Sequence, residues 1–450
     1  MRKVDEQYDW PSPTRAWYAA IVLMVTYALA YIDRTIIGLL IEPIRSDFGI
    51  SDTQVSLLGG LAFALFYVTM GLPLGRVADR ANRRNLIIAG TVIWSVMTAA
   101  CGLASNFWQL FFTRMCVGVG EATLSPAALS IISDSFPRRN RPIPLGLYMC
   151  GIAIGSGLAF LVGGFVIAWA AGATQLSLPV VGILQPWQIV FIAVGLPGLL
   201  LAALLLGIRE PRRRELRTPQ GEGGAVVSVR DALKFIFDEN RAAFLTIFVA
   251  FGGLALHSLT IPMWLPAHFR RNFGWTEADI GVPLGCLILT CGIAGMVGGA
   301  AFAARMQRRG ARDALLRTAL IMTLLMIPPA IAAPLLTDPV AALVAITPVI
   351  TLSYGLFALV PGTLYAITPN ELRGQVSAVF SFFNSAVGLA LGGTIVALFT
   401  DYVFADPRAV GRSLALTAAL VLPACALLLA LGLRPFRSSV ERALGWSADA

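Results

Sequence analysis

The sequence predicts an all-α polytopic membrane protein with twelve transmembrane helices in two six-helix bundles. Three observations lead to this fold class. First, 57% of the residues are hydrophobic and only 13% are charged, whereas soluble domains carry about a quarter charged residues. Second, the apolar residues form runs of about 20, long enough to span a bilayer as a helix, without the alternation of a membrane β-barrel. Third, a pattern of arginines recurs in the two halves of the chain.

Charged or turn-forming clusters separate the apolar runs, so each run is assigned to one helix. The expected helices cover 16–44, 54–78, 84–104, 107–134, 142–170, 187–208, 242–269, 279–304, 313–333, 339–366, 373–400 and 411–433. The longest polar stretch, 209–241, separates six helices from six. We therefore expect an N-terminal bundle at 1–208, a cytoplasmic linker at 209–241 and a C-terminal bundle at 242–450.

The linker contains a short amphipathic pattern. Val229, Leu233, Ile236 and Phe237 lie at helical spacing, and Ser228 precedes them as a candidate N-cap. This pattern predicts a short amphipathic helix on the inner membrane surface. The alternative is a solvated linker turn.

The distribution of arginine predicts the orientation in the membrane. The formal net charge is +9, and only Lys3 and Lys234 among the 34 basic residues are lysine. If both termini are cytoplasmic, the basic clusters lie inside. The outer loops then hold only Arg45, Arg270, Arg271, Arg408 and Arg412. This distribution indicates that the arginines orient a multi-pass protein in the inner (plasma) membrane. It explains the net positive charge, so nucleic-acid binding is not expected.

A repeat relates the two halves. After the second helix the chain reads GRVADRANRR over 75–84, and after the eighth it reads AAFAARMQRR over 300–309. The three arginines keep their register, while the aspartate is replaced by alanine in the second copy. Two duplicated halves joined by a linker are typical of a transporter that rocks around a central site.

The segment 75–84 resembles the loop signature G-x-x-x-D-R-x-x-R-R of the major facilitator superfamily, through Gly75, Asp79, Arg80, Arg83 and Arg84. The segments YIDR at 31–34, DFGISD at 47–52 and RMCVGVGEA at 114–122 more narrowly resemble its spinster branch. This resemblance implies a bacterial homologue that alternates between inward-open and outward-open states, with Asp79 in a gate that holds the cytoplasmic side closed. Animal spinster-like proteins export sphingosine phosphate and lysophospholipids, and bacterial relatives are often assigned to small organic anions.

Four ionisable residues stand out because they lie well inside the predicted helices of the first half: Asp33, Arg34, Arg114 and Glu121. Each costs about 3 kcal/mol at the centre of a spanning helix, so each needs a partner or a water-filled cavity. At about 1.5 Å per residue, Asp33 lies about 24 Å along the first helix. Arg114 and Glu121 lie about 10 and 20 Å along the antiparallel fourth helix. Two acids and two bases therefore converge, and their pairing stays open.

We predict that Asp33 or Glu121 binds and releases a proton during transport, and that Arg34 or Arg114 binds an anionic substrate. Low dielectric disfavours a charged carboxyl, while a nearby arginine opposes that effect. A substrate that competes for the arginine therefore couples its binding to protonation. The alternative is two ion pairs that only pin the first helix to the fourth, although buried pairs contribute little net stability.

The second half carries no acid in the interior of its predicted helices. Its candidates for one wall of a substrate cavity are His257, Trp264, Tyr354, Phe380 and Asn384. Ordinary helix packing is the alternative for the aromatic residues, and a hydrogen-bonding role without titration is the alternative for His257. A charged first half facing an aromatic second half favours an amphipathic lipid with an anionic head.

Other function classes are disfavoured. The six cysteines lie in apolar runs without metal-ligand spacing, and the sequence contains no phosphate-binding G-x-x-x-x-G-K-[ST] loop and no catalytic constellation. We therefore expect no metal, no cofactor and no enzyme activity. We expect a monomer whose partners are protons and a lipid or small-molecule substrate. The alternatives are a proton-coupled transporter of a small organic anion and, third, a non-transporting receptor.

Overall fold

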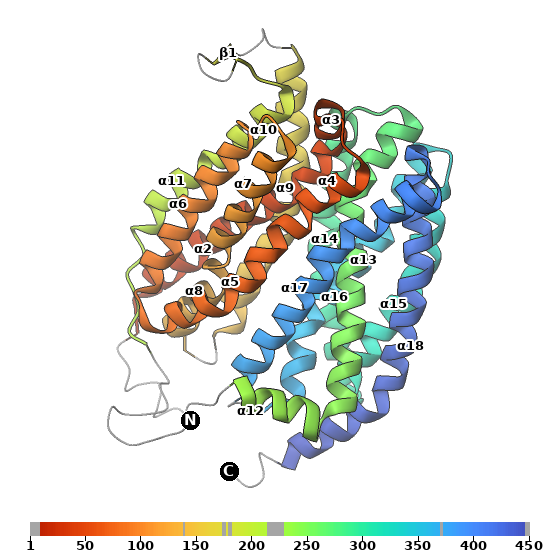
Figure 1. Ribbon diagram of the computed structural model, residues 1–450. Helices are drawn as coiled ribbons and strands as arrows, with labels where there is room; N and C mark the ends of the chain where they lie inside the picture. Colours follow the sequence, from red (N-terminus) through yellow and green to blue (C-terminus); the bar gives the residue numbers. More distant parts are fainter. Residues whose placement is uncertain are drawn as a thin grey trace. The chain divides into compact units, whose positions relative to one another are not determined.

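The computed structural model describes residues 10–137, 140–172, 177–178, 182–213, 229–369 and 372–445, and most of them are helical (Figure 1). This part of the chain contains 12 helical stretches long and apolar enough to cross a membrane. They are Pro13–Phe48, Asp52–Gly71, Arg83–Cys101, Phe107–Ser135, Pro142–Ala170, Pro186–Leu205, Arg241–Phe273, Glu277–Arg308, Ala314–Leu335, Pro339–Ala366, Arg373–Phe404 and Pro407–Ala443. The predicted fold class is confirmed. The last helix is longer than expected from the sequence, since it continues to Gly445, twelve residues beyond the predicted end at 433.

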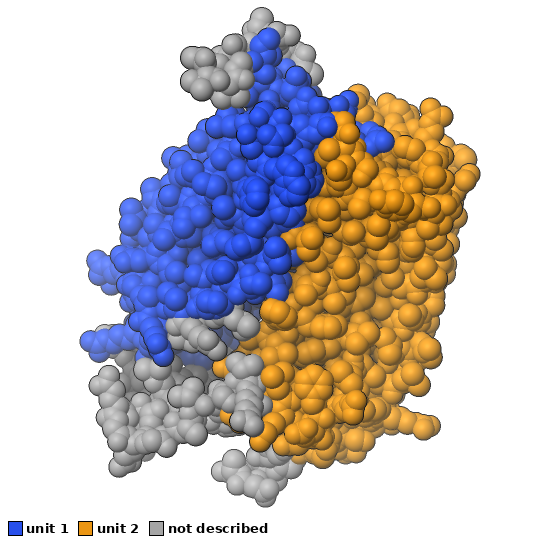
Figure 2. All heavy atoms as spheres, viewed as in Figure 1, with its two compact units in different colours: residues 1–48, 62–224 blue, residues 49–61, 225–450 orange. Residues whose placement is uncertain are grey.

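The chain divides into two compact units, coloured separately in Figure 2. Unit 1 comprises residues 1–48 and 62–224, and unit 2 comprises residues 49–61 and 225–450. The segment 49–61 lies in the first half of the sequence, yet it packs as part of unit 2. The second spanning stretch is therefore shared between the two units.

Unit 1 contains nine helices among its described residues, and several spanning stretches consist of two of them. The helices are α2 (Pro13–Thr35), α3 (Ile37–Phe48), α5 (Leu61–Arg80), α6 (Arg83–Cys101), α7 (Phe107–Glu121), α8 (Leu124–Ser135), α9 (Pro142–Gly172), α10 (Pro186–Gly195) and α11 (Pro197–Leu205). Two-residue strands β1 (Ser177–Leu178) and β2 (Gly182–Ile183) pair antiparallel. Pro197, which lacks an N–H group, begins α11 at the break after α10.

Unit 2 is built around long, less interrupted helices. They are α4 (Asp52–Gly59), α12 (Val229–Lys234), α13 (Arg241–Phe273), α14 (Glu277–Arg308), α15 (Ala314–Ala332), α16 (Pro339–Ala366), α17 (Arg373–Leu398) and α18 (Val410–Gly445). Short turns of 3-10 or π geometry are η1 (Phe235–Glu239), η2 (Ala333–Leu335), η3 (Phe399–Val403) and η4 (Pro407–Ala409). The helical turns α12 and η1 fall where the linker pattern predicts a helix. The candidate N-cap Ser228 lies outside the described residues.

Large apolar side chains face outward on both units. Phe165 is 72% exposed in unit 1, and Val344 is 67% exposed in unit 2. An outward-facing apolar surface is unfavourable in water and favourable in lipid, so this surface fits a membrane-embedded protein.

Close packing of α2 against α9 shapes the interior of unit 1. A side chain at Gly155 of α9 would place its Cβ 2.1 Å from the carbonyl oxygen of Ala28 and 2.7 Å from the Cβ of Tyr31. Only glycine allows these two helices to approach so closely. The contact holds the end of α2, which carries Asp33 and Arg34, in the middle of the unit.

Candidate functional site

The four predicted charged residues come together inside unit 1. Asp33 and Arg34 lie in the last turn of α2, while Arg114 and Glu121 lie in α7. Arg34 Nε donates to Glu121 Oε2 at 2.5 Å. Arg114 Nη1 donates to the backbone oxygen of Asp33 at 3.0 Å rather than to its carboxylate. The sequence did not decide which acid pairs with which arginine. In the structure, the ion pair is Arg34 with Glu121.

Both helices end beside these charges. Helix α2 stops at Thr35, one residue after Arg34, and α3 resumes at Ile37. Helix α7 ends at Glu121 itself, and α8 begins at Leu124. Ile36, Ala122 and Thr123 between these helices keep helical backbone angles. The N–H groups of Ile36 and Ala122 still donate to the oxygens of Ile32 and Gly118. Each spanning stretch therefore continues past its charged residues.

The cluster holds more hydrogen-bonding capacity than its contacts use. Asp33 and Arg114 are fully buried, and Glu121 is 1% exposed. Thr98 Oγ1 donates to Asp33 Oδ2 at 3.2 Å. Within the described residues, Asp33 Oδ1, Glu121 Oε1 and both Arg114 Nε and Nη2 have no hydrogen-bond partner. A buried polar atom without a partner costs about 1–3 kcal/mol. The cluster therefore contributes little stability to the contact between the two helices, and its unused groups are suited to binding a polar ligand.

Aromatic rings surround the arginine of this pair. The Arg34 guanidinium carbon lies 4.5 Å from the ring centre of Tyr67, 4.9 Å from that of Phe63 and 5.0 Å from that of Tyr31. Tyr27 and Tyr148 stack beside Tyr31, with ring centres 4.4 Å apart. The sequence-based search missed these rings, although Tyr27, Tyr31 and Arg34 share one helix face through spacings of four and three.

The loop motif supplies a buried arginine at the opposite end of unit 1. Arg83 is 1% exposed and pairs with Asp134 and with Glu210, the latter at 2.7 Å between Nε and Oε1. Its Nη1 also donates to Ser130 Oγ at 2.7 Å. Arg83 therefore ties α6 to α8 and to the segment after α11.

The other motif residues are placed less tightly. Gly75 lies in α5 and the side chain of Arg80 is exposed, while Arg84 donates its backbone N–H to Glu210 Oε2 at 3.0 Å. The side chain of Asp79 lies outside the described part of the structure.

The candidates in unit 2 do not form one cluster. Trp264 is fully buried, and its Nε1 donates to the Gly393 oxygen at 2.8 Å, which joins α13 to α17. Phe380 is 5% exposed and meets Phe248 edge to face at 5.3 Å. Both placements agree with the alternative given for the aromatic residues, which is ordinary packing between helices.

The polar candidates of unit 2 come from three different helices. His257 is 3% exposed, neither ring nitrogen has a hydrogen-bond partner among the described residues, and it lines a small pocket otherwise bounded by apolar side chains. Tyr354 in α16 and Asn384 in α17 are partly exposed.

Comparison with known proteins agrees with this fold. The chain matches the family described as Major Facilitator Superfamily over residues 23–393. The chain therefore belongs to the major facilitator superfamily, a family of membrane transporters.

Within that superfamily the chain is spinster-like. It is 34% identical over 167 residues to the sphingosine-1-phosphate transporter SPNS2 of Xenopus tropicalis, a match that covers 36% of this chain and 32% of that protein. It resembles the crystal structure of a bacterial homologue of the human lysosomal transporter spinster in an inward-facing, occupied conformation. The TM-score is 0.74 at 25% identity, over 96% of this chain and 98% of that one.

Two further relatives are bacterial. An MFS-type efflux pump of Mycolicibacterium smegmatis is 27% identical over 415 residues, which is 91% of each protein. A probable L-galactonate transporter of Escherichia coli is 26% identical over 288 residues, covering 62% of this chain and 59% of that protein.

Proposed function

We propose that this protein is a proton-coupled secondary transporter of an amphipathic anionic lipid, such as a lysophospholipid or a sphingoid phosphate, that works by alternating access. The observation that carries this proposal is the buried Arg34–Glu121 pair. It stands beside Asp33 and Arg114, whose polar atoms are only partly used, so a substrate and a proton have groups to bind.

The proposed coupling step is an exchange of partners at Arg34. An anionic head that binds the Arg34 guanidinium competes with Glu121 for it. A carboxylate that loses its arginine partner in a low-dielectric interior favours taking up a proton. The aromatic rings of Tyr31, Phe63 and Tyr67 can hold the guanidinium by their faces while its N–H groups change partner. Release of the substrate restores the pair and expels the proton.

Two substrate classes compete. The aromatic surroundings of Arg34 and the similarity to SPNS2 favour a lipid. The similarity to a probable L-galactonate transporter favours the second candidate, a small organic anion. Either substrate is an anion, so the role of Arg34 is the same for both.

The remaining parts of the proposal follow from the sequence. The arginine distribution supports a protein of the inner membrane with both termini in the cytoplasm. We also propose that the protein works as a monomer. We propose Asp79 as part of the cytoplasmic gate. We also propose His257, Tyr354 and Asn384 as polar contributors to the substrate path from unit 2.

Proton flux into liposomes that contain the purified protein and a trapped pH dye tests the proposal. We expect a lysophospholipid added outside to drive proton movement in the parent protein, after subtraction of the signal from empty liposomes. Glu121→Gln should reduce this signal to that of empty liposomes, because a glutamine cannot exchange a proton at that position.

Asp47→Asn is the matched control. Its carboxylate lies in the same unit and accepts from Trp187 Nε1 at 3.0 Å, an acceptor role that asparagine retains. A flux that persists in Glu121→Gln contradicts the coupling role of Glu121. A flux that appears only with a small sugar acid contradicts the lipid substrate and supports the second candidate.

A further inference from the structure

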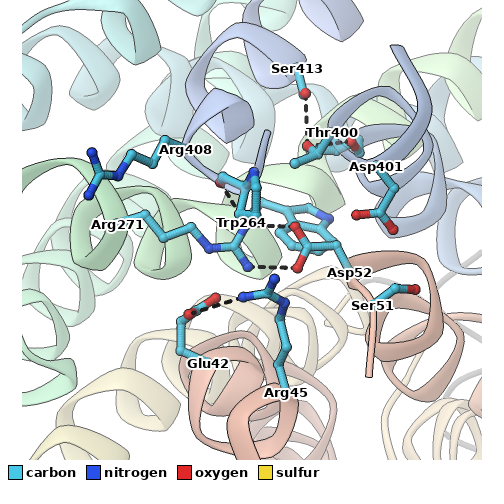
Figure 3. A network of polar contacts seen from close by, with 12 residues as sticks. Glu42, Arg45, Ser51, Asp52, Trp264, Arg271, Thr400, Asp401, Arg408 and Ser413 are labelled. Carbon is cyan, nitrogen blue, oxygen red and sulfur yellow. Dashed lines mark hydrogen bonds and ion pairs between the residues drawn. The ribbon is translucent and has the colours of Figure 1, made fainter. Parts of the chain in front are cut away.

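Two arrangements of arginine around a buried carboxylate occur in the described part of unit 2. In the first, the arginine is buried as well: Arg271 donates to both oxygens of Asp52 at 2.6 and 2.7 Å, and its side chain is only 5% exposed (Figure 3). In the second, the arginines stay exposed. Arg317 and Arg437 bind Asp313, whose side chain is 1% exposed, while their own side chains are 41% and 48% exposed. The Asp313 cluster is therefore open to a further ligand.

Asp313 holds the two guanidinium groups side by side. Arg437 Nη2 and Arg317 Nη2 both donate to the same oxygen, Asp313 Oδ2, at 2.6 and 3.0 Å. Each guanidinium has five N–H donors, and this contact uses one of them. Planar guanidinium groups match the oxygens of a phosphate group in geometry and in charge. One buried carboxylate thus positions two cations whose remaining donors fit a phosphate.

Two further arginines accompany this pair. Arg434 lies one turn before Arg437 in α18 and is exposed. Arg312 precedes α15 and makes an exposed ion pair with Glu441, one turn after Arg437, at 2.7 Å. Arg312, Arg317, Arg434 and Arg437 form the basic corner of unit 2. Its four arginines outnumber the two acids beside them, Asp313 and Glu441, so the corner carries a net positive charge.

Apolar side chains continue from the basic corner along both helices. Helix α15 packs against α18, and the two lie side by side in Figure 1. Leu324 follows Arg317 by seven residues in α15, so the two share one helix face. Leu427 precedes Arg434 by seven residues in α18 and shares its face in the same way. Both leucines are at least half exposed. The seam between α15 and α18 therefore has an apolar length and a cationic end.

We propose that the seam between α15 and α18 binds an anionic phospholipid of the surrounding bilayer, with the phosphate on the basic corner and an acyl chain along Leu324 and Leu427. Basic clusters between spanning helices at the membrane surface bind anionic head groups in this way. A free phosphate ion would contact the arginines alone. A phospholipid contacts the arginines and the leucines together, so the apolar seam favours the lipid.

This site is separate from the proposed substrate site. It uses no residue of the Arg34–Glu121 pair, and all its residues belong to unit 2. The bound lipid is a resident of the membrane that holds the ends of α15 and α18 together, and it is not the transported substrate.

Photo-crosslinking locates the lipid. Purified protein in detergent is incubated with phosphatidylglycerol that carries a diazirine in one acyl chain, illuminated and digested, and the modified peptides are identified by mass spectrometry. We expect modification of the α15 peptide that contains Leu324 and of the α18 peptide that contains Leu427. Phosphatidylcholine with the same diazirine should modify these peptides about fivefold less, because its choline group cancels the charge of the phosphate.

Two variants test the basic corner. Arg434→Gln should lower labelling by phosphatidylglycerol about fivefold, the effect of one arginine at a membrane surface. It leaves Asp313 and its two partners intact, so no buried contact is lost. The triple variant Asp313→Asn with Arg317→Gln and Arg437→Gln should lower labelling about tenfold or more, and it leaves no buried charge without a counterion.

The matched control is Arg15→Gln with Arg305→Gln. Both arginines are exposed, and they lie in α2 and α14 rather than in the seam. This control removes two positive charges and should leave labelling of the α15 and α18 peptides unchanged.

Four results overturn the proposal. One is equal labelling by the two phospholipids, which indicates a general contact with lipid. Another is unchanged labelling in Arg434→Gln and in the triple variant. The third is an equal loss in the control, which indicates an effect of net charge. The fourth is loss of the label when inorganic phosphate is added at the same concentration as the lipid, which indicates a site for soluble phosphate. None of these results bears on the Glu121→Gln flux experiment.

Discussion

At the scale of single residues, Arg34 is held by two different kinds of contact. One is the charge-assisted hydrogen bond to Glu121, and the other is the set of ring faces of Tyr31, Phe63 and Tyr67. A hydrogen bond is directional and can be exchanged for one to a substrate, whereas ring faces attract the cation without consuming its N–H donors. This combination keeps Arg34 in place while its partner changes.

The contribution of the rings is testable at Tyr67. We expect Tyr67→Ala to raise the KM for the anionic substrate about 2- to 30-fold, the range of one cation–π contact. Tyr67→Phe keeps the ring and should keep the KM within about twofold. The dependence of liposome proton flux on substrate concentration measures both variants. Equal losses in Tyr67→Phe and Tyr67→Ala would assign the effect to the hydroxyl instead.

A second residue-scale prediction concerns Asp313, outside the membrane-spanning segments. Burial raises the pKa of this carboxyl, but hydrogen bonds from Arg437 at 2.6 Å and Arg317 at 3.0 Å outweigh burial and lower the pKa below its ordinary value. A lowered pKa in the folded state means that Asp313 stabilises the fold above its ordinary pKa. This contribution is lost as the pH falls through the folded-state pKa.

Thermal unfolding of Asp313→Asn measures this contribution. We expect the midpoint to fall by about 2–4 °C at pH 7, as for a loss of about 1 kcal/mol. The difference from the parent should shrink as the pH approaches and passes below about 4. Glu441→Gln is the control. Both side chains of its pair with Arg312 are exposed, so this variant should leave the unfolding midpoint nearly unchanged. A difference that stays constant with pH would contradict the role of the Asp313 charge.

At the scale of helices, the contact between the first and fourth spanning stretches decides the chemistry of unit 1. Arg34 lies one residue before the end of α2, and Glu121 is the last residue of α7. Their ion pair joins these two helices directly. Close packing of α2 on α9 then holds the end of α2, with Asp33 and Arg34, in its position.

Gly155 tests the helix contact behind the site. Gly155→Ala would place a Cβ 2.1 Å from the Ala28 oxygen. We expect a stability loss of about 1–3 kcal/mol, as for overpacked interiors, together with weaker substrate binding because Tyr31 must shift. Gly146→Ala on the same helix meets no atom within 4 Å and should change neither property. Thermal unfolding and flux measurements on both variants check this. Wild-type behaviour of Gly155→Ala would mean that α2 and α9 separate at little cost.

At the scale of the whole molecule, the duplicated halves keep an ion pair in a related place with the charges exchanged. In unit 1, Arg83 at the start of α6 pairs with Glu210 after α11. In unit 2, Asp313 before α15 pairs with Arg437 in α18. Each pair joins the start of the third spanning helix of its half to the end of the sixth. Both pairs join the same two helices of their halves, because either order of the charges can make this contact.

Alternating access predicts that a covalent link between α4 and α17 stops transport. We expect Ser56→Cys with Thr394→Cys, whose parent oxygens lie 3.4 Å apart, to lose substrate-driven flux when oxidised and to regain it after reduction. Thr400→Cys with Ser413→Cys is the matched control, because its parent oxygens lie 2.8 Å apart between η3 and α18 within unit 2. This control should transport in both redox states. Full transport by the oxidised Ser56→Cys/Thr394→Cys protein would show that α4 need not move.

The sequence was a good guide to some of these features and a poor guide to others. The charged residues of the site were predicted, because an acid or arginine in an apolar run is conspicuous. Their pairing was not, since Arg34 and Glu121 are separated by 87 positions. The rings of Phe63 and Tyr67 were not predicted. Aromatic residues are common in spanning helices, and no local sequence pattern distinguishes those that contact a cation.

By itself, the sequence determined the twelve spanning helices and the membership of a transporter family. Spanning helices follow from hydropathy summed over about 20 neighbouring residues, which is local information. Only the tertiary structure decided that Arg34 pairs with Glu121 and that the segment 49–61 packs in unit 2. The Asp52–Arg271 pair joins positions 219 apart, and such partnerships depend on which helices the packing brings together. Hydropathy does not distinguish one pair of neighbouring helices from another, because all the spanning helices are similarly apolar.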